Sequence, residues 1–201
     1  MKRILQSLAV VAGMAAAWNA GATLDIPDGN PVGVASTINV SGLGTIGTIS
    51  LTLNISGGNN GDLYAYLSYG GNVVTLLNRP GVTGGNPLGF TASGYNVTVA
   101  DGGADGDLNT AGSPVNGGTY YAAGNSTALG TAYVNGGSTG TWTLFLADLS
   151  GGDTSESQLV SWYLDINGTT VPEPVTGALI VFGLMGVLTQ LAAWRSRRKS
   201  V

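Results

Sequence analysis

The side chains of this 201-residue chain that are best suited to chemistry are carboxylates in one glycine-rich segment. Asp101, Asp105 and Asp107 lie within the stretch ADGGADGDLN. Carboxylate oxygens are the ligands of hard cations such as calcium, and glycines let a loop fold tightly around the ion. The segment therefore predicts a calcium-binding loop, although no acidic residue stands at the twelfth position, as an EF-hand loop would require. The alternative is a solvated acidic turn, in which Asp and Gly serve only as good turn residues.

Three further aspartates are second candidates for metal ligands, because they stand at the ends of expected strands: Asp62, Asp148 and Asp153. Each of them has an alternative structural role. Asp62 could accept backbone hydrogen bonds and fix the turn before its strand, and Asp148 could do the same after its own strand.

The composition argues against an enzyme. The chain has no histidine and no cysteine, which excludes a Ser-His triad, a thiol nucleophile and the usual zinc sites. Residues 23–174 contain no lysine, so Schiff-base chemistry is excluded there as well. Paired carboxylates could hydrolyse glycosides in principle, but the acids lie in glycine-rich turns and nothing indicates a pocket that would raise one pKa.

The charges are strongly partitioned along the chain. Residues 23–174 hold all eleven acidic residues and a single basic residue, Arg79, which gives this segment a net charge of −10. A segment with one cation offers no electrostatic footprint for phosphate backbones, so nucleic acid is a poor partner. An acidic surface suits divalent cations better.

The hydrophobic pattern of the central segment predicts an all-β domain. Apolar residues alternate with polar ones over 48–55, 62–69, 141–147 and 160–166, which is the pattern of half-buried strands. Weaker patterns predict strands at 34–40, 73–77 and 96–100. Gly-Gly and Asn-Gly turns separate these segments, and no part of this region shows a convincing helical period. We expect an antiparallel two-sheet β-sandwich, with Trp142 and Trp162 in its core.

Both ends of the chain predict export. Lys2 and Arg3 precede the apolar run 4–17, and Ala20-Gly21-Ala22 is typical of a signal-peptidase site, so residues 1–22 are predicted to be a signal peptide. The alternative is an uncleaved N-terminal anchor. Residues 175–194 carry no charge and, at about 1.5 Å per residue, match a bilayer core of roughly 30 Å.

A basic cluster follows the predicted transmembrane helix and indicates its cytoplasmic end: Arg195, Arg197, Arg198 and Lys199. The predicted organisation is a signal peptide (1–22), a β-sandwich (23–168), a proline-containing linker (169–174), a transmembrane helix (175–194) and a cytoplasmic basic tail (195–201).

The linker contains Pro172, Glu173 and Pro174 directly before the predicted helix. This tripeptide, the single span and the Arg-rich end, in that order, resemble a PEP-CTERM sorting signal. The resemblance implies a bacterial surface protein that is anchored in the inner membrane and then processed by an exosortase. It also implies a structural or adhesive role in an exopolysaccharide matrix or biofilm, with the Pro-Glu-Pro motif as the recognition element. An ordinary, permanently anchored envelope protein is the alternative.

The central segment carries a second resemblance, over roughly residues 25–167. The motifs are Ile26-Pro27-Asp28, Gly61-Asp62-Leu63, the stretch 74–81, Gly140-Thr141-Trp142 with Asp148, Gly152-Asp153-Thr154 and Ser161-Trp162. Their succession looks like the P domain (P/homo B) found beside subtilisin-like proprotein convertases. The resemblance implies a jelly-roll-like β-sandwich that often binds calcium. The chain departs from the family at Val99-Ala100-Asp101, where an aromatic-Asp-Asp element is common.

These observations together predict a non-enzymatic, secreted surface or matrix protein. The alternative is a calcium- or glycan-binding accessory module for a separate secreted hydrolase. The tyrosines at 64, 66, 69, 120 and 121 keep the glycan-binding alternative open, since exposed aromatic rings on a sheet face can stack on sugars.

Overall fold

The computed structural model describes residues 13–20, 23–112 and 115–170, together with Met185. The strands are β1 Gly13–Ala20, β2 Leu24–Ile26, β3 Asn30–Val40, β4 Leu43–Ser56, β5 Leu63–Tyr69, β6 Asn72–Asn78, β7 Tyr95–Ala100, β8 Val115–Tyr120, β9 Gly140–Asp148 and β10 Ser157–Thr170. One short helix, α1, spans Ala128–Tyr133, and the 3-10 turns η1 and η2 span Asn60–Asp62 and Leu108–Thr110.

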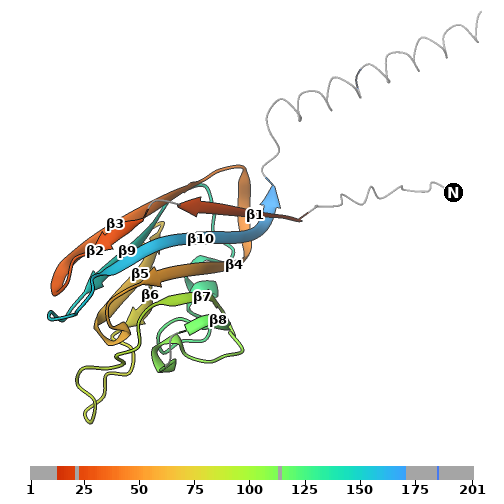
Figure 1. The fold of residues 1–201 in the computed structure, drawn as a ribbon. Helices are drawn as coiled ribbons and strands as arrows, with labels where there is room; N and C mark the ends of the chain where they lie inside the picture. The colour runs from red at the N-terminus through yellow and green to blue at the C-terminus, as the bar shows by residue number, and fades with distance from the viewer. Residues whose placement is uncertain (1–12, 21–22, 113–114, 171–184, 186–201) are drawn as a thin grey trace, which may run out of the picture. The chain divides into compact units, whose positions relative to one another are not determined.

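The strands form two sheets that lie face to face (Figure 1). One sheet has the order β1-β10-β4-β7-β8, with β2 also paired to β10, and the other has the order β3-β9-β5-β6. This arrangement confirms the predicted all-β sandwich. The paired strands are antiparallel except β7 and β8, which run parallel. The sequence predicted purely antiparallel sheets, and this pair departs from that prediction.

No helix among the described residues is long and apolar enough to cross a membrane. The predicted transmembrane helix (175–194, apart from Met185), the Pro-Glu-Pro motif and the basic tail lie outside the described residues.

The core is built from the inward faces of the alternating strands, as the pattern predicts. On β4, for example, Leu51 and Leu53 are fully buried between the sheets. Both predicted core tryptophans are fully buried. The Trp142 indole N–H donates to the Ser138 carbonyl at 3.0 Å, and that of Trp162 donates to the Ser36 hydroxyl at 2.9 Å, so neither polar atom is left unpaired.

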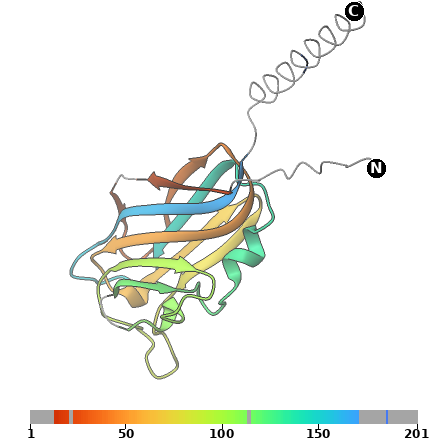
Figure 2. The same ribbon diagram turned by 90° about the vertical axis from the view of Figure 1, so that its right-hand side faces the viewer.

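Helix α1 is a feature that the sequence pattern did not predict. It contacts β4 of one sheet and β6 of the other, and therefore covers one side of the sandwich (Figure 2). Its buried Tyr133 donates a hydrogen bond to the Leu67 carbonyl at 2.7 Å and lies edge-on to Trp142. Six residues are too few to show a helical period, and the contacts of Tyr133 come from distant strands.

Strand β1 lies at the opposite side of the sandwich, where it pairs with β10 and contacts β3. Its residues, Gly13–Ala20, fall within the segment that the sequence predicts to be the signal peptide. The structure therefore places part of that predicted segment in a sheet of the domain.

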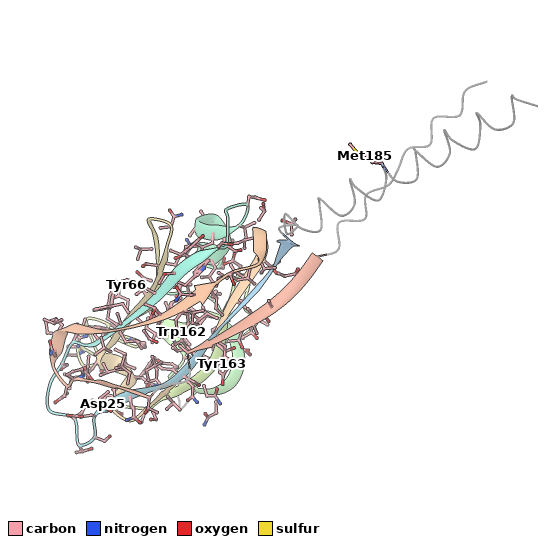
Figure 3. All side chains as sticks on the ribbon, turned by 90° about the horizontal axis from the view of Figure 1, so that it is seen from above. Asp25, Tyr66, Trp162, Tyr163 and Met185 are labelled. Atoms are coloured by element: carbon pink, nitrogen blue, oxygen red, sulfur yellow. The ribbon has the colours of Figure 1, made fainter. Side chains whose placement is uncertain are left out.

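We expect Trp162→Ala to lower the free energy of unfolding by about 3–5 kcal/mol, because it would leave a large cavity between the sheets. The neighbouring Tyr163 is 39% exposed on the outer face of the same strand (Figure 3), so Tyr163→Ala should cost less than about 1 kcal/mol. Urea unfolding followed by circular dichroism measures both. Equal decreases in the free energy of unfolding for the two variants would contradict the assignment of Trp162 to the inner face of β10 and Tyr163 to its outer face.

Candidate metal centre

The register of β9 brings three segments to the same end of the sandwich. Asp148, the last residue of β9, lies opposite Asn30 of β3 on one side and opposite Leu63 of β5 on the other. Asp28 comes two residues before Asn30, and Asp62 comes one residue before Leu63. The pairing of β9 with both neighbours therefore gathers three aspartates that are far apart in sequence.

Asp153, in the loop between β9 and β10, completes the cluster. Asp28, Asp148 and Asp153 each offer one carboxylate oxygen, and these oxygens all lie within 4.8 Å of one another. Among the described residues they are the only group of three or more acidic side chains gathered in this way. Asp62 adjoins the group and interacts electrostatically with Asp148 and Asp153. We call these four residues the aspartate cluster.

The turn before η1 holds Asp153 in place. The Asn59 backbone N–H donates to one Asp153 oxygen at 2.8 Å, and its side-chain amide donates to the other. The same amide lies 3.5 Å from Asp62 Oδ2. Gly58 lets this turn lie close to the start of β10. Its φ is +60°, and a Cβ at this position would collide with the Ser157 hydroxyl. Asn59 thus links two members of the aspartate cluster.

Two carboxylate oxygens of the cluster are buried without a hydrogen-bond partner, Asp28 Oδ1 and Asp62 Oδ1. The residue Asp62 is only 5% exposed, and its Oδ1 lies 3.7 Å from the Arg79 guanidinium, beyond hydrogen-bond distance. Buried polar atoms are normally paired, and an unpaired carboxylate oxygen is expensive. Asp28 Oδ1 thus has neither a hydrogen bond nor an ion pair, whereas Asp62 Oδ1 is ion-paired with Arg79.

The remaining oxygens accept backbone or hydroxyl hydrogen bonds. Asp28 Oδ2 accepts from the Gly152 N–H at 2.9 Å. Asp148, which is fully buried, accepts from the Ser150 N–H at 3.2 Å and from the Ser157 hydroxyl at 3.4 Å. Because these donors fix the carboxylate orientations, the cluster is held in one geometry by the loop between β9 and β10.

The electrostatics of the cluster are repulsive. Burial raises the pKa of the Asp62 carboxyl above 3.8, and the neighbouring Asp153 raises it further, whereas Asn59 and Arg79 lower it. Burial also raises the pKa of Asp148, with smaller increases from Asp153, Asp62 and Asp28. Four carboxylates beside one guanidinium leave an excess of negative charge that a divalent cation would neutralise.

The three converging oxygens lie close enough together to hold one metal ion. Calcium binds six to eight oxygens at about 2.3–2.6 Å, so two oxygens on opposite sides of the ion lie about 5 Å apart. The three converging oxygens are within that span, whereas Asp62 Oδ1 forms an ion pair with Arg79 at 3.7 Å and is not one of the group. Main-chain carbonyls and water commonly complete such a coordination sphere.

The structure does not bring the first predicted set of ligands together. Asp101 accepts from the N–H groups of Leu129 and Gly130, at 3.0 and 2.7 Å, at the start of α1. Asp105 accepts from the Thr119 N–H at 2.7 Å. Each carboxylate thus binds backbone amides of a different segment.

Asp107 behaves in the same way. Its two oxygens accept from the N–H groups of Asn109 and Gly124, both at 2.9 Å. The carboxylates of the glycine-rich loop therefore accept backbone hydrogen bonds, most of them from other segments, and are not gathered into one group.

Of the second set of predicted candidates, Asp148 and Asp153 converge with Asp28, which the sequence-based prediction missed, whereas Asp62 adjoins the group without belonging to it. The signal was present in Ile26-Pro27-Asp28, the motif that opens the P-domain resemblance. A single aspartate before a strand cannot be assigned to a partner more than a hundred residues away until the register of β9 is known.

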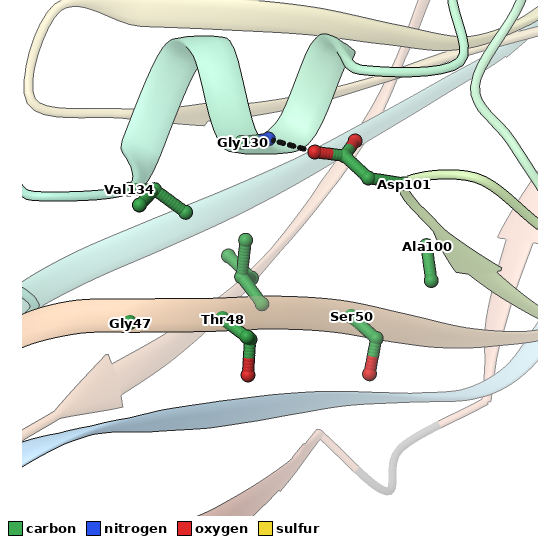
Figure 4. A pocket seen from close by; sticks show the side chains of 8 residues that line it. Gly47, Thr48, Ser50, Ala100, Asp101, Gly130 and Val134 are labelled. Atoms are coloured by element: carbon green, nitrogen blue, oxygen red, sulfur yellow. Dashed lines mark hydrogen bonds between the residues drawn. The ribbon is translucent and has the colours of Figure 1, made fainter.

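A surface pocket lies elsewhere, between β4, the end of β7 and α1 (Figure 4). The only charged side chain that lines it is Asp101, which is bound to the Gly130 N–H. Its other lining residues include Thr48, Ser50 and Val134, with no group positioned to activate a hydroxyl.

Comparisons with known proteins do not assign a family. No family model matches the chain, and no curated protein matches it. Among solved structures, the serine protease of Aeromonas sobria is similar over 78% of this chain and 27% of that chain, with 16% identity and a TM-score of 0.47. The crystal structure of that protease in complex with the chaperone ORF2 is similar over 80% of this chain and 28% of that chain, with 14% identity and a TM-score of 0.47. The chain thus spans about a quarter of the length of these chains, and the likeness carries no functional assignment.

The raised pKa values give a pH dependence of stability without bound cation. Because the folded state keeps protons on Asp62 and Asp148 that the unfolded state has already released, stability should rise as pH falls through the folded pKa values toward 3.8. Thermal melts between pH 7.5 and 5 in chelator measure this rise. We expect a flatter profile for Asp148→Asn, and an unchanged profile for Asp165→Asn, which alters an exposed aspartate of β10. Parallel profiles for the wild type and Asp148→Asn would contradict this assignment.

Proposed function

We propose that the described domain is a P-domain-like, jelly-roll sandwich stabilised by a calcium ion at the aspartate cluster. The observation that carries the proposal is the convergence of carboxylate oxygens from Asp28, Asp148 and Asp153 within 4.8 Å of one another, with Asp28 Oδ1 buried and without a hydrogen-bond partner. Without a cation, several negative charges share one partly buried site. A bound calcium ion converts that repulsion into attraction and ties the β2–β3 turn, η1 and the β9–β10 loop to one another.

We further propose that the protein is exported and acts at the cell surface or in the extracellular matrix, without enzymatic activity. The sequence supports this through its predicted signal peptide and through the Pro172-Glu173-Pro174 motif before an apolar run. An exosortase is the proposed processing partner. A calcium-stabilised sandwich suits an extracellular role, because extracellular modules use calcium sites with dissociation constants of about 10⁻⁴–10⁻³ M.

Calcium should raise the melting temperature of the protein. At ten to a hundred times the dissociation constant, binding to the native state alone adds about 1.4–2.7 kcal/mol of stability. We expect a melt in 10 mM calcium to lie above one in chelator, and the shift to disappear in Asp148→Asn combined with Asp153→Asn. Differential scanning calorimetry provides the measurement.

The matched control is Asp101→Asn combined with Asp105→Asn, which removes two carboxylates of the glycine-rich loop. This variant should lose some stability, because its backbone hydrogen bonds weaken, but should keep the calcium shift. If its shift vanished while that of Asp148→Asn with Asp153→Asn survived, the ion would belong to the glycine-rich loop. A wild-type melt that is indifferent to calcium would refute the proposed site.

A glycan-binding accessory module is the second candidate, and one observation favours it. Tyr64, Tyr66 and Phe145 lie together, half-buried, on the face of the β3-β9-β5-β6 sheet that is turned away from the core. Tyr66 stacks on Phe145 with ring centroids 4.7 Å apart and an interplanar angle of 14°, and Tyr64 meets Tyr66 edge-on at 6.1 Å. A row of aromatic rings on a sheet face can stack on the rings of a polysaccharide.

If this face binds glycans, Tyr66→Ala should weaken retardation in polysaccharide affinity gels about tenfold, which corresponds to about 1.4 kcal/mol. Tyr163→Ala, which removes an exposed tyrosine from the other sheet, is the matched control and should leave retardation unchanged. Migration of the wild type that does not change with polysaccharide would remove this candidate.

A further inference from the structure

Strand β10 has two very different edges. On one side it pairs with β4 over nearly its whole length. On the other side it pairs with β2 only at residues 157–159, and with β1 at residues 162–169. Eight residues of this second edge are therefore covered only by β1, a segment that lies within the predicted signal peptide.

We propose that removal of residues 1–22 opens the β10 edge at 162–169, and that this edge then pairs antiparallel with the same edge of a second copy of the protein. The inference rests on the proposed export, because it needs the signal peptide to be removed. It adds a partner and a surface to that proposal.

The edge is well suited to accept a strand. The pairing of β1 with β10 runs through eight consecutive residue pairs without a bulge, whereas the pairing of β4 with β10 shows three irregularities. Exposed edges are usually protected by lysine, proline, a bulge or an inward charge. Residues 162–169 (WYLDINGT) contain no lysine or proline, and their one charge, Asp165, is exposed on the outer face.

Loss of β1 also uncovers part of the core. Ala16 and Ala20 of β1 pack against the core cluster, which includes Leu164 and Ile166 of β10. Both of these β10 residues are fully buried while β1 is in place. Removal of the strand therefore frees backbone hydrogen-bonding groups and apolar surface at the same place, and a new strand would satisfy both.

A second copy can pair with this edge, and the charge of Asp165 excludes one register and favours another. Residues directly opposite in an antiparallel pair point to the same face, so outward residues must meet outward residues. A two-fold axis at Asp165 would place two like charges opposite each other, which is destabilising. An axis at Ile166 instead places Asp165 opposite Asn167 of the second copy, and Tyr163 opposite Thr169.

Two-fold symmetric dimers, in which identical patches meet, are the commonest homo-oligomers. The proposed pairing would join the β10-β4-β7-β8 strands of two molecules into one continuous sheet. Asn167 can donate a hydrogen bond to the carboxylate of Asp165, so the selected register is favourable as well as permitted.

The chain contains no cysteine, so introduced cysteines report on this pairing without interference. We expect the full chain carrying Asp165→Cys with Asn167→Cys, exported and isolated from the cell surface, to form disulfide-linked dimers on a non-reducing gel. The matched control, Thr52→Cys with Asn54→Cys, has the same spacing on the interior strand β4 and should remain monomeric.

A variant that keeps the predicted signal peptide, called here the leader-retaining chain, tests the role of β1. Ala22→Arg, which disrupts the predicted cleavage site, should keep β1 in place and abolish the dimer of the Asp165→Cys, Asn167→Cys chain. Intact mass spectrometry establishes where each isolated chain begins and ends. Dimers in the leader-retaining chain, or a mature chain that still carries residues 13–20, would overturn the proposal.

A charge variant tests the register without cysteines. Asn167→Asp should weaken the dimer in analytical ultracentrifugation, because it places two pairs of carboxylates opposite each other. Combining it with Asp165→Asn should restore the dimer. A mature chain that begins at residue 23, is found at the cell surface and stays monomeric would refute the pairing while leaving the proposed export intact.

Discussion

The register of β9 is the constraint on which the rest of this structure depends. β9 is the interior strand that joins β3 to β5, and its last residue, Asp148, is level with the start of both neighbours. Shifting that register by one residue would turn Trp142 away from the core, because successive side chains of a strand face opposite ways. The register that is observed buries Trp142 and also brings Asp28, Asp62 and Asp148 to one end of the sandwich.

This convergence creates an electrostatic cost within an otherwise apolar fold. The carboxylates of Asp101 and Asp107, for example, accept backbone hydrogen bonds from Leu129 and Gly124. In the aspartate cluster, by contrast, Asp28 Oδ1 is buried without a hydrogen-bond partner and the pKa values of Asp62 and Asp148 are raised. Places where a fold departs from good local pairing are often functional sites. A calcium ion would remove the cost and make the same residues a source of stability.

Strand β10 is the interior strand that organises the other sheet, as β9 organises the first. It carries Trp162 into the core and links β4 to the outer strands β1 and β2. Because β1 lies within the predicted signal peptide, the proposed removal of that peptide would take one strand from this sheet. The proposed calcium site lies where β9 ends, and the proposed pairing edge covers residues 162–169 of β10. Calcium binding and self-association can thus be examined separately.

The sequence alone determined the strands that alternate strictly, including those of Leu51 and Leu53, of Trp142 and of Trp162, because burial of one sheet face leaves a period of two in the local sequence. It also indicated Asp62, Asp148 and Asp153 as strand-end carboxylates. It did not reveal α1, the parallel pairing of β7 with β8, or the membership of Asp28 in the cluster. Only the tertiary structure decided these features, since each depends on contacts between segments distant in sequence. Strand register and the closeness of two carboxylates leave no periodic trace in the residues that form them.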